Sequence, residues 1–479
     1  MPQIILSFSL SLIFLLALTF CSVPSLARLN NVRSNLSSLI INLSRSRNVI
    51  SQNYAISSSL QSDPLIFNVV EPLRAIRDGY LMSLNIGTPP QVIQVYMDTG
   101  SDLAWVPCGN LSFDCIECDA YYRTNKLTNA FSPLYSSSSL RVSCGSSFCT
   151  QIHNSDNPYD PCIMAGCPLI TLLKGTCSRP CPGFAYTYGG DAVVVGTLTS
   201  DLLRIHSSSP STTKDIERFR FGCIGSTYKE PLGIAGFGRG SLSLPSQLGF
   251  LQKGFSHCFV SFKFASNPNI SSPLIIGEMA ISSKETSKFT SLLTNPTYPN
   301  YYYIGLEAIT ISNMTLKKVP SKLQEIDSKG NGGMMIDSGT TYTHLSEPFY
   351  SEFLSELDSM ILYPRATKLE KQSGFDLCYE VPCPNNNRSF CMENDDLPSI
   401  TFHFVDDVRL VLPKGNNFYA ISPPSNFSVV KCLLYQGVDD EIGGPSAIFG
   451  SFQQQNIEVV YDLENERIGF NPMDCAATQ

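Results

Sequence analysis

One short pattern occurs twice in this chain, and it constrains the fold more than any other feature. The first copy is Val95-Tyr-Met-Asp98-Thr-Gly-Ser101 and the second is Met334-Met-Ile-Asp337-Ser-Gly-Thr340. In each copy an apolar run leads to an aspartate, a hydroxyl residue, a glycine and a second hydroxyl residue. An internal repeat indicates similar structural units, and 479 residues are enough for more than one domain. We therefore predict two similar lobes that each present one aspartate.

Further segments support this prediction and indicate the secondary structure. Ile234-Ala-Gly236 follows the first copy and Ile448-Phe-Gly450 follows the second, each more than a hundred residues later. Tyr80 to Gly87 and Gln91 to Met97 alternate apolar and polar residues on either side of a Thr-Pro-Pro turn, which is typical of strands. Helical periodicity is rare, and residues 347–362 are the best short candidate. The predicted fold class is all-β.

The residues around each aspartate suit a tight, hydrogen-bonded loop. The apolar run indicates the end of a buried strand, and the glycine two positions after the aspartate permits a turn that an ordinary side chain resists. The second hydroxyl can donate a hydrogen bond to the carboxylate, while the first can brace the two loops against each other. These supporting residues are Thr99, Gly100 and Ser101 in the first copy and Ser338, Gly339 and Thr340 in the second.

Two facing lobes would bring Asp98 and Asp337 within a few ångströms of each other. Two carboxylates that close cannot both ionise easily, so they share one proton and titrate as a pair. The ionised carboxylate can then activate a water, while the protonated one donates to a scissile carbonyl. This chemistry hydrolyses peptide bonds without a metal or a covalent intermediate, and it should peak below neutral pH. Either aspartate could begin as the base.

The N-terminal end has the features of a targeting segment and a prosegment. Ile4 to Phe20 is apolar and is followed by Ser25-Leu-Ala27, so residues 1–27 are predicted to be a secretory signal peptide, with a signal anchor as the alternative. Residues 28–76 hold five arginines against two acidic residues, whereas the whole chain carries a net charge of −8. A basic piece ahead of an acidic body indicates a prosegment, cleaved between residues 65 and 79. A loosely ordered extension is the alternative.

The cysteine count supports an oxidising compartment. Without Cys21 in the signal peptide, sixteen of the seventeen cysteines remain, an even number typical of a disulfide framework. Nine of them lie in residues 108–181, so at least one disulfide must leave this cluster if all sixteen pair. Cys115-Ile-Glu-Cys118 resembles half a zinc site, but no second such pair follows and the five histidines form no spaced pair. We therefore predict no metal and no cofactor.

Other features limit the partners. The net negative charge argues against nucleic acid, and no Gly-x-Ser-x-Gly motif indicates a serine hydrolase. Beyond the signal peptide no apolar run is long enough to span a bilayer, so no stable membrane anchor is predicted. A monomer is the default expectation. Five Asn-x-Ser/Thr sequons in residues 77–479 are candidate glycosylation sites, namely Asn110, Asn269, Asn313, Asn387 and Asn426.

Longer motifs around these residues resemble those of pepsin-family aspartic proteases, specifically the plant secreted nepenthesin-like type. A single Asp-Thr-Gly is usually a turn, but here the motifs run in family order from about residue 79 to Cys475. The matching stretches are Tyr80-Leu-Met-Ser-Leu-Asn-Ile-Gly-Thr-Pro-Pro-Gln, Asp98-Thr-Gly-Ser-Asp-Leu-Ala-Trp-Val-Pro-Cys, Tyr186-Thr-Tyr-Gly, Gly233-Ile-Ala-Gly-Phe-Gly-Arg-Gly-Ser-Leu-Ser, Ile336-Asp-Ser-Gly-Thr-Thr and Ile448-Phe-Gly-Ser-Phe-Gln-Gln-Gln-Asn.

The resemblance implies a bilobal, all-β pepsin-like acid protease fold with an active-site cleft between the lobes. The lobes would span residues 77–292 and 293–479, and the first would carry a cysteine-rich insert (108–181) and a flap hairpin (184–198). Asp98 and Asp337 match the family's catalytic aspartates. Tyr188, followed by Gly189, matches the flap tyrosine, and Trp105 matches the tryptophan that supports it, although Trp105 could be a plain core aromatic. By the same resemblance, Cys378 pairs with Cys432.

Two departures from the family pattern concern the flap and the prosegment. Asp191 and Ala192 stand where related sequences usually carry Gly-Ser, which could change the stiffness of the flap or its response to pH. The prosegment also lacks the lysine-rich character of animal zymogens. Inhibition by a basic prosegment in an acidic cleft therefore does not follow from this sequence.

The function that we predict is an aspartic-type endopeptidase that cleaves proteins or peptides at acidic pH. It would be secreted to the extracellular space or cell wall, with the vacuole as another possible destination. The alternative is a pepsin-fold binding protein that inhibits cell-wall glycanases. Such proteins commonly lack a complete second catalytic motif, whereas Asp98-Thr-Gly-Ser and Asp337-Ser-Gly-Thr are both intact here. Fold alone does not decide between them.

Overall fold

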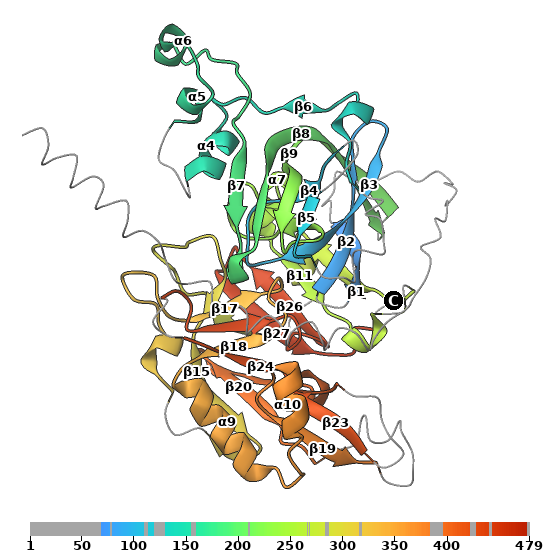
Figure 1. Ribbon diagram of the computed structural model, residues 1–479, viewed down its shortest axis with the longest axis vertical. Coiled ribbons are helices and arrows are strands. Elements are labelled where there is room, and N and C mark those ends of the chain that lie inside the picture. The colour runs from blue at the N-terminus through green and yellow to red at the C-terminus, as the bar shows by residue number, and fades with distance from the viewer. Residues whose placement is uncertain are drawn as a thin grey trace, which may run out of the picture.

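The computed structural model describes residues 69–76, 79–109, 114–118, 130–154, 160–208, 211–265, 267, 269–282, 287–315, 319–383, 396–421, 428–439 and 443–476. Strands dominate these residues, and they form two stacked lobes (Figure 1). The prediction of an all-β, bilobal fold is confirmed.

The largest sheet has 15 strands and contains most of the N-terminal half of the chain. Its strands are β1 (Val69–Ile76), β2 (Gly79–Ile86), β3 (Gln91–Asp98), β4 (Trp105–Pro107), β5 (Asp114–Ile116), β6 (Leu140–Arg141), β7 (Phe184–Thr187), β8 (Val193–Ser208), β9 (Ser211–Tyr228), β10 (Gly233–Gly236), β11 (Phe255–Cys258), β12 (Ser272–Ile276), β13 (Lys288–Ser291), β26 (Ile457–Asp462) and β27 (Arg467–Pro472). Strand β1 lies within the predicted prosegment and pairs with both β12 and β2.

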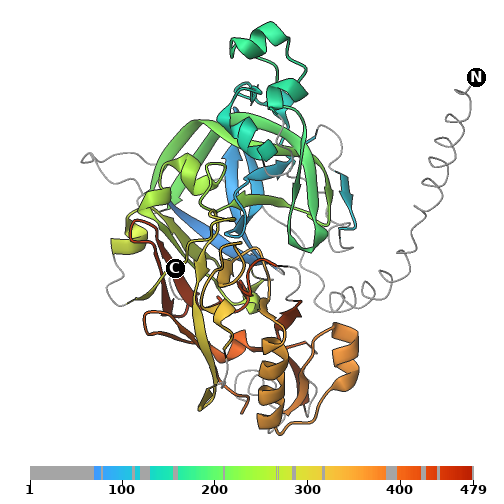
Figure 2. The same ribbon diagram turned by 90° about the vertical axis from the view of Figure 1, so that its left-hand side faces the viewer.

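Three smaller sheets contain the other strands of the C-terminal half (Figure 2). The five-stranded sheet joins β14 (Tyr303–Ile304), β17 (Met334–Asp337), β25 (Ala447–Gly450), β18 (Thr343–Ser346) and β24 (Tyr435–Val438). The four-stranded sheet joins β16 (Met314–Thr315), β15 (Leu306–Ile311), β20 (Ile400–Phe404) and β21 (Val408–Val411), and the three-stranded sheet joins β19 (Cys378–Pro382), β23 (Ser428–Leu433) and β22 (Phe418–Ala420).

The strands follow from period-two patterning. In β2 the apolar residues Tyr80, Met82, Leu84 and Ile86 are buried, while the residues between them are partly exposed, because successive side chains point to opposite faces of a strand. The helices are short: α4 (Ser147–Asn154), α5 (Pro161–Met164), α6 (Leu169–Leu173), α7 (Leu244–Leu248), α8 (Met279–Ser282), α9 (Phe349–Met360) and α10 (Thr367–Ser373). Helix α9 confirms the helix predicted in residues 347–362.

A shared sheet connects the two halves, and the two-lobe prediction did not foresee it. Strand β26 pairs with β11 from the N-terminal half and with β27. Figure 1 shows β26 and β27, near the C-terminus, between the two lobes. Two strands from the end of the chain therefore complete a sheet that begins with strands from its first half.

The disulfides confirm that at least one bridge leaves the cysteine-rich insert, since Cys108 pairs with Cys223. Cys115–Cys118, Cys144–Cys162, Cys149–Cys181 and Cys167–Cys177 pair within the insert, and Cys258–Cys475 and Cys378–Cys432 pair elsewhere. Cys383 is also disulfide-bonded. A disulfide framework of this kind is typical of the secretory pathway.

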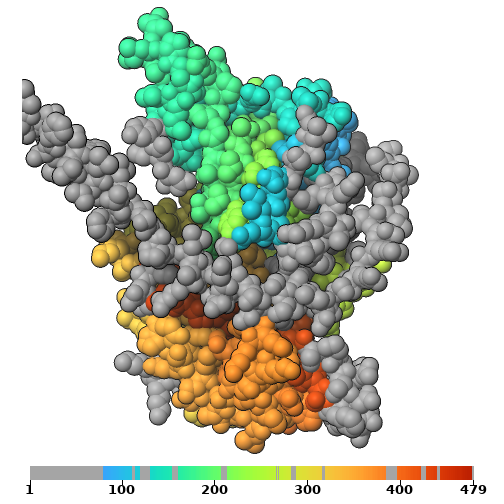
Figure 3. Space-filling model, viewed as in Figure 1, coloured from blue at the N-terminus to red at the C-terminus, as the bar shows by residue number. Residues whose placement is uncertain are grey.

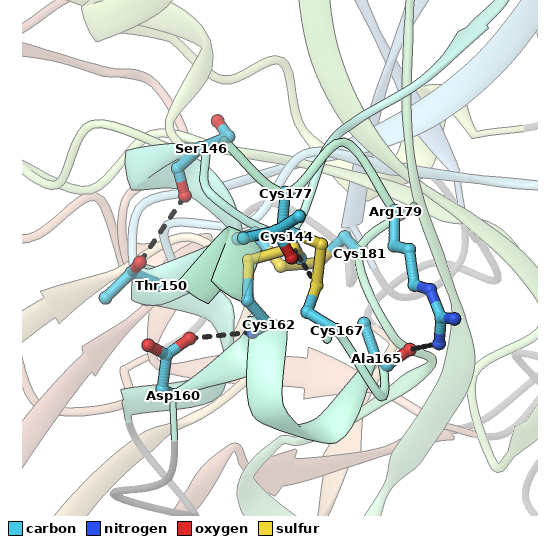
Figure 4. The surroundings of a disulfide bond; sticks show 12 residues. Cys144, Ser146, Thr150, Asp160, Cys162, Ala165, Cys167, Cys177, Arg179 and Cys181 are labelled. Carbon is cyan, nitrogen blue, oxygen red and sulfur yellow. Dashed lines mark hydrogen bonds between the residues drawn. A yellow bond between two sulfur atoms is a disulfide. The ribbon is translucent and has the colours of Figure 1, made fainter. Parts of the chain in front are cut away.

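Part of the insert projects from the N-terminal lobe and is cross-linked by disulfides. Helices α5 and α6 stand out from the lobe in the ribbon and space-filling views (Figure 3), whereas Cys149 and Ile152 of α4 pack into the core of the lobe. The Cys144–Cys162 and Cys167–Cys177 bridges lie side by side, with 3.6 Å between the Sγ atoms of Cys144 and Cys167 (Figure 4). Close groups of cysteines in the described residues therefore consist of disulfide sulfurs, which lack the thiolate character that zinc requires.

Several sequence predictions fall outside the described residues. These are the signal peptide, most of the prosegment, and the sequons at Asn110, Asn387 and Asn426. The sequons at Asn269 and Asn313 lie on exposed positions. Among the helices that the structure describes, none combines the length and the apolar character needed to span a bilayer.

Candidate active site

Two matching strand pairs place the two aspartates. Strand β3 ends at Asp98 and runs parallel to β10, where Gly236 is its register partner. Strand β17 ends at Asp337 and runs parallel to β25, where Gly450 is the partner. The segments Ile234–Gly236 and Ile448–Gly450, which follow the two motif copies in the sequence, therefore lie beside the two aspartates in the same way. The internal repeat is thus a repeat of tertiary structure.

Both carboxylates are buried and held by donors from their own loops. Asp98 is 5% exposed and Asp337 is 7% exposed. Asp98 accepts hydrogen bonds from the backbone N–H of Gly100, at 2.8 Å, and from the hydroxyl of Ser101. In the second loop, Asp337 accepts from the corresponding N–H and hydroxyl at 2.8 and 2.5 Å, and these donors are Gly339 and Thr340.

The other predicted hydroxyls brace the two loops reciprocally. The backbone N–H of Thr99 donates to Ser338 Oγ at 3.0 Å, and that of Ser338 donates to Thr99 Oγ1 at 2.9 Å. Each hydroxyl also donates to the opposite strand, since Thr99 Oγ1 contacts the Ile336 carbonyl at 3.1 Å and Ser338 Oγ contacts the Met97 carbonyl at 2.9 Å. Four buried hydrogen bonds therefore fix one lobe's loop against the other's.

Glycine at the second position after each aspartate is required by the opposite carboxylate. A Cβ atom added to Gly100 would overlap the carboxylate of Asp337, and one added to Gly339 would overlap that of Asp98. The backbone and a carboxylate come too close there for any side chain. The glycine of each motif therefore admits the aspartate from the other lobe, in addition to permitting a turn.

Burial and mutual repulsion shape the electrostatics of the pair. Desolvation raises the pKa of Asp98 well above its ordinary value, and the neighbouring charge of Asp337 raises it further. The hydrogen bonds from Ser101 and Gly100 oppose this shift because they stabilise the ionised form. The Asp98 carboxyl also hydrogen-bonds to Asp337. The structure therefore brings the two carboxyl groups into direct hydrogen-bond contact.

The predicted flap residues lie beside this pair. Tyr188 lies at the tip of the hairpin formed by β7 and β8, next to the 3-10 turn η2 (Gly189–Asp191). The indole Nε1–H of Trp105 donates to the Tyr188 hydroxyl at 2.8 Å. Trp105 is fully buried, so it is both a core aromatic and the support of Tyr188. Asp191, one of the two departures in the flap, adopts the left-handed region with φ of 63°.

Asp102 is a residue of this site that sequence reasoning missed. Its carboxylate accepts from the backbone N–H of Gly240 and from the side-chain amide of Asn300, both at 2.7 Å. Burial raises its pKa to about 6. A Cβ atom at Gly238 or Gly240 would overlap this carboxylate, which explains the glycines of Gly236-Phe-Gly-Arg-Gly240. Those alternating glycines were the available sequence signal.

Two tyrosines also lie near the aspartates without having been predicted. Tyr186 on β7 and Tyr301 hydrogen-bond to each other. Burial, followed by the charges of Asp102 and Asp98, raises the pKa of Tyr301 to about 12. The ring centroids of Tyr186 and Tyr188 are 5.0 Å apart. The flap side of the site is therefore lined by aromatic rings that keep their phenolic protons.

A separate cavity of about 470 Å³ lies in the C-terminal half of the chain and excludes both aspartates. Among its lining residues are Ser346, at the end of β18, and Ser446, just before β25. Asp337 lies at the other end of the same sheet, because it pairs with Gly450 at the far end of β25. This cavity is therefore not part of the aspartate site.

Comparison with known proteins decides the family. The family model for the N-terminal domain of xylanase inhibitors matches residues 80–278, and the model for their C-terminal domain matches residues 301–472. The chain belongs to the pepsin-like aspartic protease family. The resemblance stated from the motifs is thereby confirmed.

Named relatives in this family include plant proteases. A probable aspartyl protease of Arabidopsis thaliana is 36% identical over 436 residues, which cover 83% of this chain and 82% of the relative. Nepenthesin-1 of Nepenthes gracilis is 32% identical over 406 residues, covering 84% and 79%. Nepenthesin-2 of the same species is 32% identical over 428 residues, covering 88% and 83%.

Solved structures of similar fold include a globulin from soybean. The crystal structure of edgp matches with a TM-score of 0.62 and 20% identity, covering 86% of this chain and 96% of its own. Basic 7S globulin from soybean matches with a TM-score of 0.59 and 19% identity, covering 86% and 97%. At this level of identity the likeness concerns the fold alone.

Proposed function

We propose that the protein is an aspartic endopeptidase that hydrolyses peptide bonds at acidic pH. The observation that carries the proposal is the pair formed by Asp98 and Asp337, in which each carboxylate is held by a backbone N–H and a hydroxyl of its own loop. Homology to plant aspartic proteases supports peptide substrates.

The proposed reaction needs only the two carboxyls and a water molecule. The ionised carboxylate takes a proton from the water as the oxygen attacks the scissile carbonyl carbon, and the protonated carboxyl donates to the carbonyl oxygen. Collapse of the tetrahedral intermediate then breaks the C–N bond, and the amine leaves with a proton from the pair. Acid–base assistance of this kind contributes roughly 10²–10⁴-fold. The raised pKa of Asp98 favours a shared proton in acid.

The cellular setting remains part of the proposal. We infer that the chain is made with a signal peptide and a prosegment, enters the secretory pathway as a zymogen, and acts as a monomer outside the cell or in the vacuole. The disulfides support this inference. Glycosylation is proposed at the five sequons, of which Asn269 and Asn313 lie on exposed positions. The division into lobes at residues 77–292 and 293–479 is likewise proposed.

An inhibitor of cell-wall glycanases is the second candidate, because the matching family models are described as xylanase inhibitor domains. Both aspartate loops are complete here, and Tyr188 is hydrogen-bonded to Trp105. A protein that only binds another enzyme has no need of this arrangement. We therefore favour the protease.

A pH-resolved digestion tests the proposal. The purified protein, after removal of its prosegment, is expected to cleave casein or denatured globin at about pH 3–5, where carboxyl groups titrate. Asp98→Asn and Asp337→Asn should each reduce the rate by at least about 10²–10⁴-fold. Gly339→Ala should do the same, because its methyl group would occupy the space of the Asp98 carboxylate. Mass spectrometry of the products would report the cleavage sites.

A matched control separates chemistry from folding. Asp215→Asn removes an exposed carboxylate that pairs with Arg204, far along the chain from both loops, and should leave the rate unchanged. If Asp98→Asn or Asp337→Asn retains wild-type activity, the assignment of the pair is wrong. An inert wild-type protein that binds a xylanase or glucanase tightly would instead establish the inhibitor.

A further inference from the structure

The tip of the flap receives a hydrogen bond from a residue outside the flap. Lys229 Nζ donates to the backbone carbonyl of Gly190 at 2.8 Å. Gly190 lies in the turn at the tip, where the backbone N–H of Tyr188 also donates to the Ala192 carbonyl at 2.8 Å. The turn is therefore closed internally by one bond and tied to the body of the lobe by another.

The position of Lys229 follows from the strands beside the flap. Strand β9 runs antiparallel to β8 up to the flap, with Tyr228 as the register partner of Val193. Lys229 is the next residue, and its backbone N–H donates to the Ile116 carbonyl of β5 at 2.9 Å. Strand β5 thus holds the end of β9 on the side opposite the flap. The backbone from which the Lys229 side chain extends is therefore fixed.

The backbone of Lys229 is itself unusual. Its φ is 67°, in the left-handed region that side chains other than glycine rarely adopt. A strained residue persists only where its surroundings hold it, and strain of this kind is frequent at functional sites. Here the strained position turns the chain at the end of β9, and the side chain of Lys229 reaches the flap tip. The next carbonyl, of Glu230, is held by the Thr227 hydroxyl at 2.7 Å.

We propose that Lys229 is a latch that sets the opening equilibrium of the flap. Beyond its ladder with β9, the flap would be held at two further points, at Tyr188 by Trp105 and at its tip by Lys229. A peptide that enters beneath the flap needs the latch to release, and re-formation of the bond closes the flap over the peptide. Lys229 is a positioning residue, because the groups that hold the catalytic carboxylates are Gly100, Ser101, Gly339 and Thr340. Its effect on peptide cleavage rests on the proposed function.

The latch can be measured without activity, through the single tryptophan of the chain. Trp105 is fully buried and donates to Tyr188, so flap opening should expose it. In Lys229→Met we expect acrylamide to quench Trp105 fluorescence several-fold more efficiently than in the wild type. Lys229→Arg keeps a charged donor and should restore wild-type quenching. Lys214→Met is the matched control, because Lys214 Nζ also donates to a backbone carbonyl, that of Leu248, at 3.0 Å.

Kinetics provide the second readout. A charge-assisted hydrogen bond at a partly exposed position should change the flap equilibrium about three- to tenfold. We therefore expect Lys229→Met to raise KM by that factor, with little change in kcat and an unchanged pH profile. Thermal unfolding of each variant shows that it is folded.

The two readouts separate failure of the latch from failure of the proposed function. If the wild type cleaves peptides but Lys229→Met matches it in both quenching and KM, the latch is wrong. If the wild type cleaves nothing, quenching still decides the latch on its own. Increased quenching in Lys229→Met together with full rescue by Lys229→Arg supports it, whereas equal quenching in all variants overturns it.

Discussion

At the scale of single residues, the interior holds a histidine whose titration opposes acid stability. His257 on β11 is fully buried, and its ring stacks on that of Phe259 with 3.9 Å between centroids. Its Nδ1 has no hydrogen-bond partner in the described residues. Burial lowers the pKa of His257 to about 3, so the ring stays neutral in the folded protein at pH values where an unfolded histidine, with a pKa near 6.5, is protonated.

The sign of the pH effect follows from this difference. Between pH 6.5 and 3 the unfolded chain binds more protons at this site, so the stability lost grows as the pH falls. At pH 4 the loss is about 3 kcal/mol. We expect His257→Phe, which keeps a stacking ring, to lower this loss, measured as the urea-unfolding free energy at pH 7 minus that at pH 4. A variant with the same difference as the wild type would contradict the prediction. The variant is compared with the wild type because the raised pKa of Asp102 has the opposite effect on stability in both proteins. Protonation of Asp102 adds stability as the pH falls.

At the scale of elements, disulfides join strands that hydrogen bonds already pair. Cys378 on β19 and Cys432 on β23 are register partners in an antiparallel ladder, with their Cα atoms 4.0 Å apart. Both side chains are fully buried. The bridge closes a loop over 54 positions of sequence, and it therefore restricts the unfolded chain more than it adds contacts to the folded one.

Removal of this bridge should destabilise the protein without moving the strands. We expect Cys378→Ala/Cys432→Ala to lower the free energy of unfolding by about 4 kcal/mol, from the entropy of the released loop. Guanidinium unfolding followed by circular dichroism measures the change. The double variant avoids a lone thiol, and the Cys115–Cys118 bridge, which closes a loop of only 3 positions, offers a control with a smaller expected effect. Equal losses for the two bridges would argue against the entropic explanation.

At the scale of the whole molecule, the two halves share one sheet. Strands β26 and β27 come from the end of the chain; β26 pairs with β11, and β27 pairs with β26. The Cys258–Cys475 bridge adds a covalent link between the same regions, across 217 positions of sequence. The reciprocal hydrogen bonds of Thr99 and Ser338 join the halves again beside the two aspartates. Without the other half, each half would therefore lack some of its strand, disulfide and hydrogen-bond partners.

We therefore expect the two halves to unfold together. Trp105 fluorescence reports only the N-terminal half, whereas far-ultraviolet circular dichroism reports both, and the two transitions should coincide. The Cys258→Ala/Cys475→Ala variant should unfold in one step at a lower temperature, because its strands can still pair. Two separate dichroism steps, with fluorescence following only one, would show that the halves are independent.

The local pattern of the sequence determined much of this protein. The duplicated aspartate motif predicted two lobes, and the alternation of Tyr80 to Gly87 predicted β2, because burial on one face of a strand is a local property. An odd number of cysteines in the insert predicted a bridge out of it, realised as Cys108–Cys223. Family motifs indicated Trp105 and Tyr188 together, and the structure places them in hydrogen-bond contact.

Tertiary structure alone decided which distant residues meet. Asp102 and Asn300 are 198 positions apart, and nothing near either residue predicts their hydrogen bond. The pairing of β26 with β11 and the hydrogen bond from Lys229 to Gly190 also join residues that local patterns do not connect. Hydrophobic periodicity shows which face of a strand is buried, but carries no information about the partner that buries it. Which partner buries each face is decided by the packing of the complete chain.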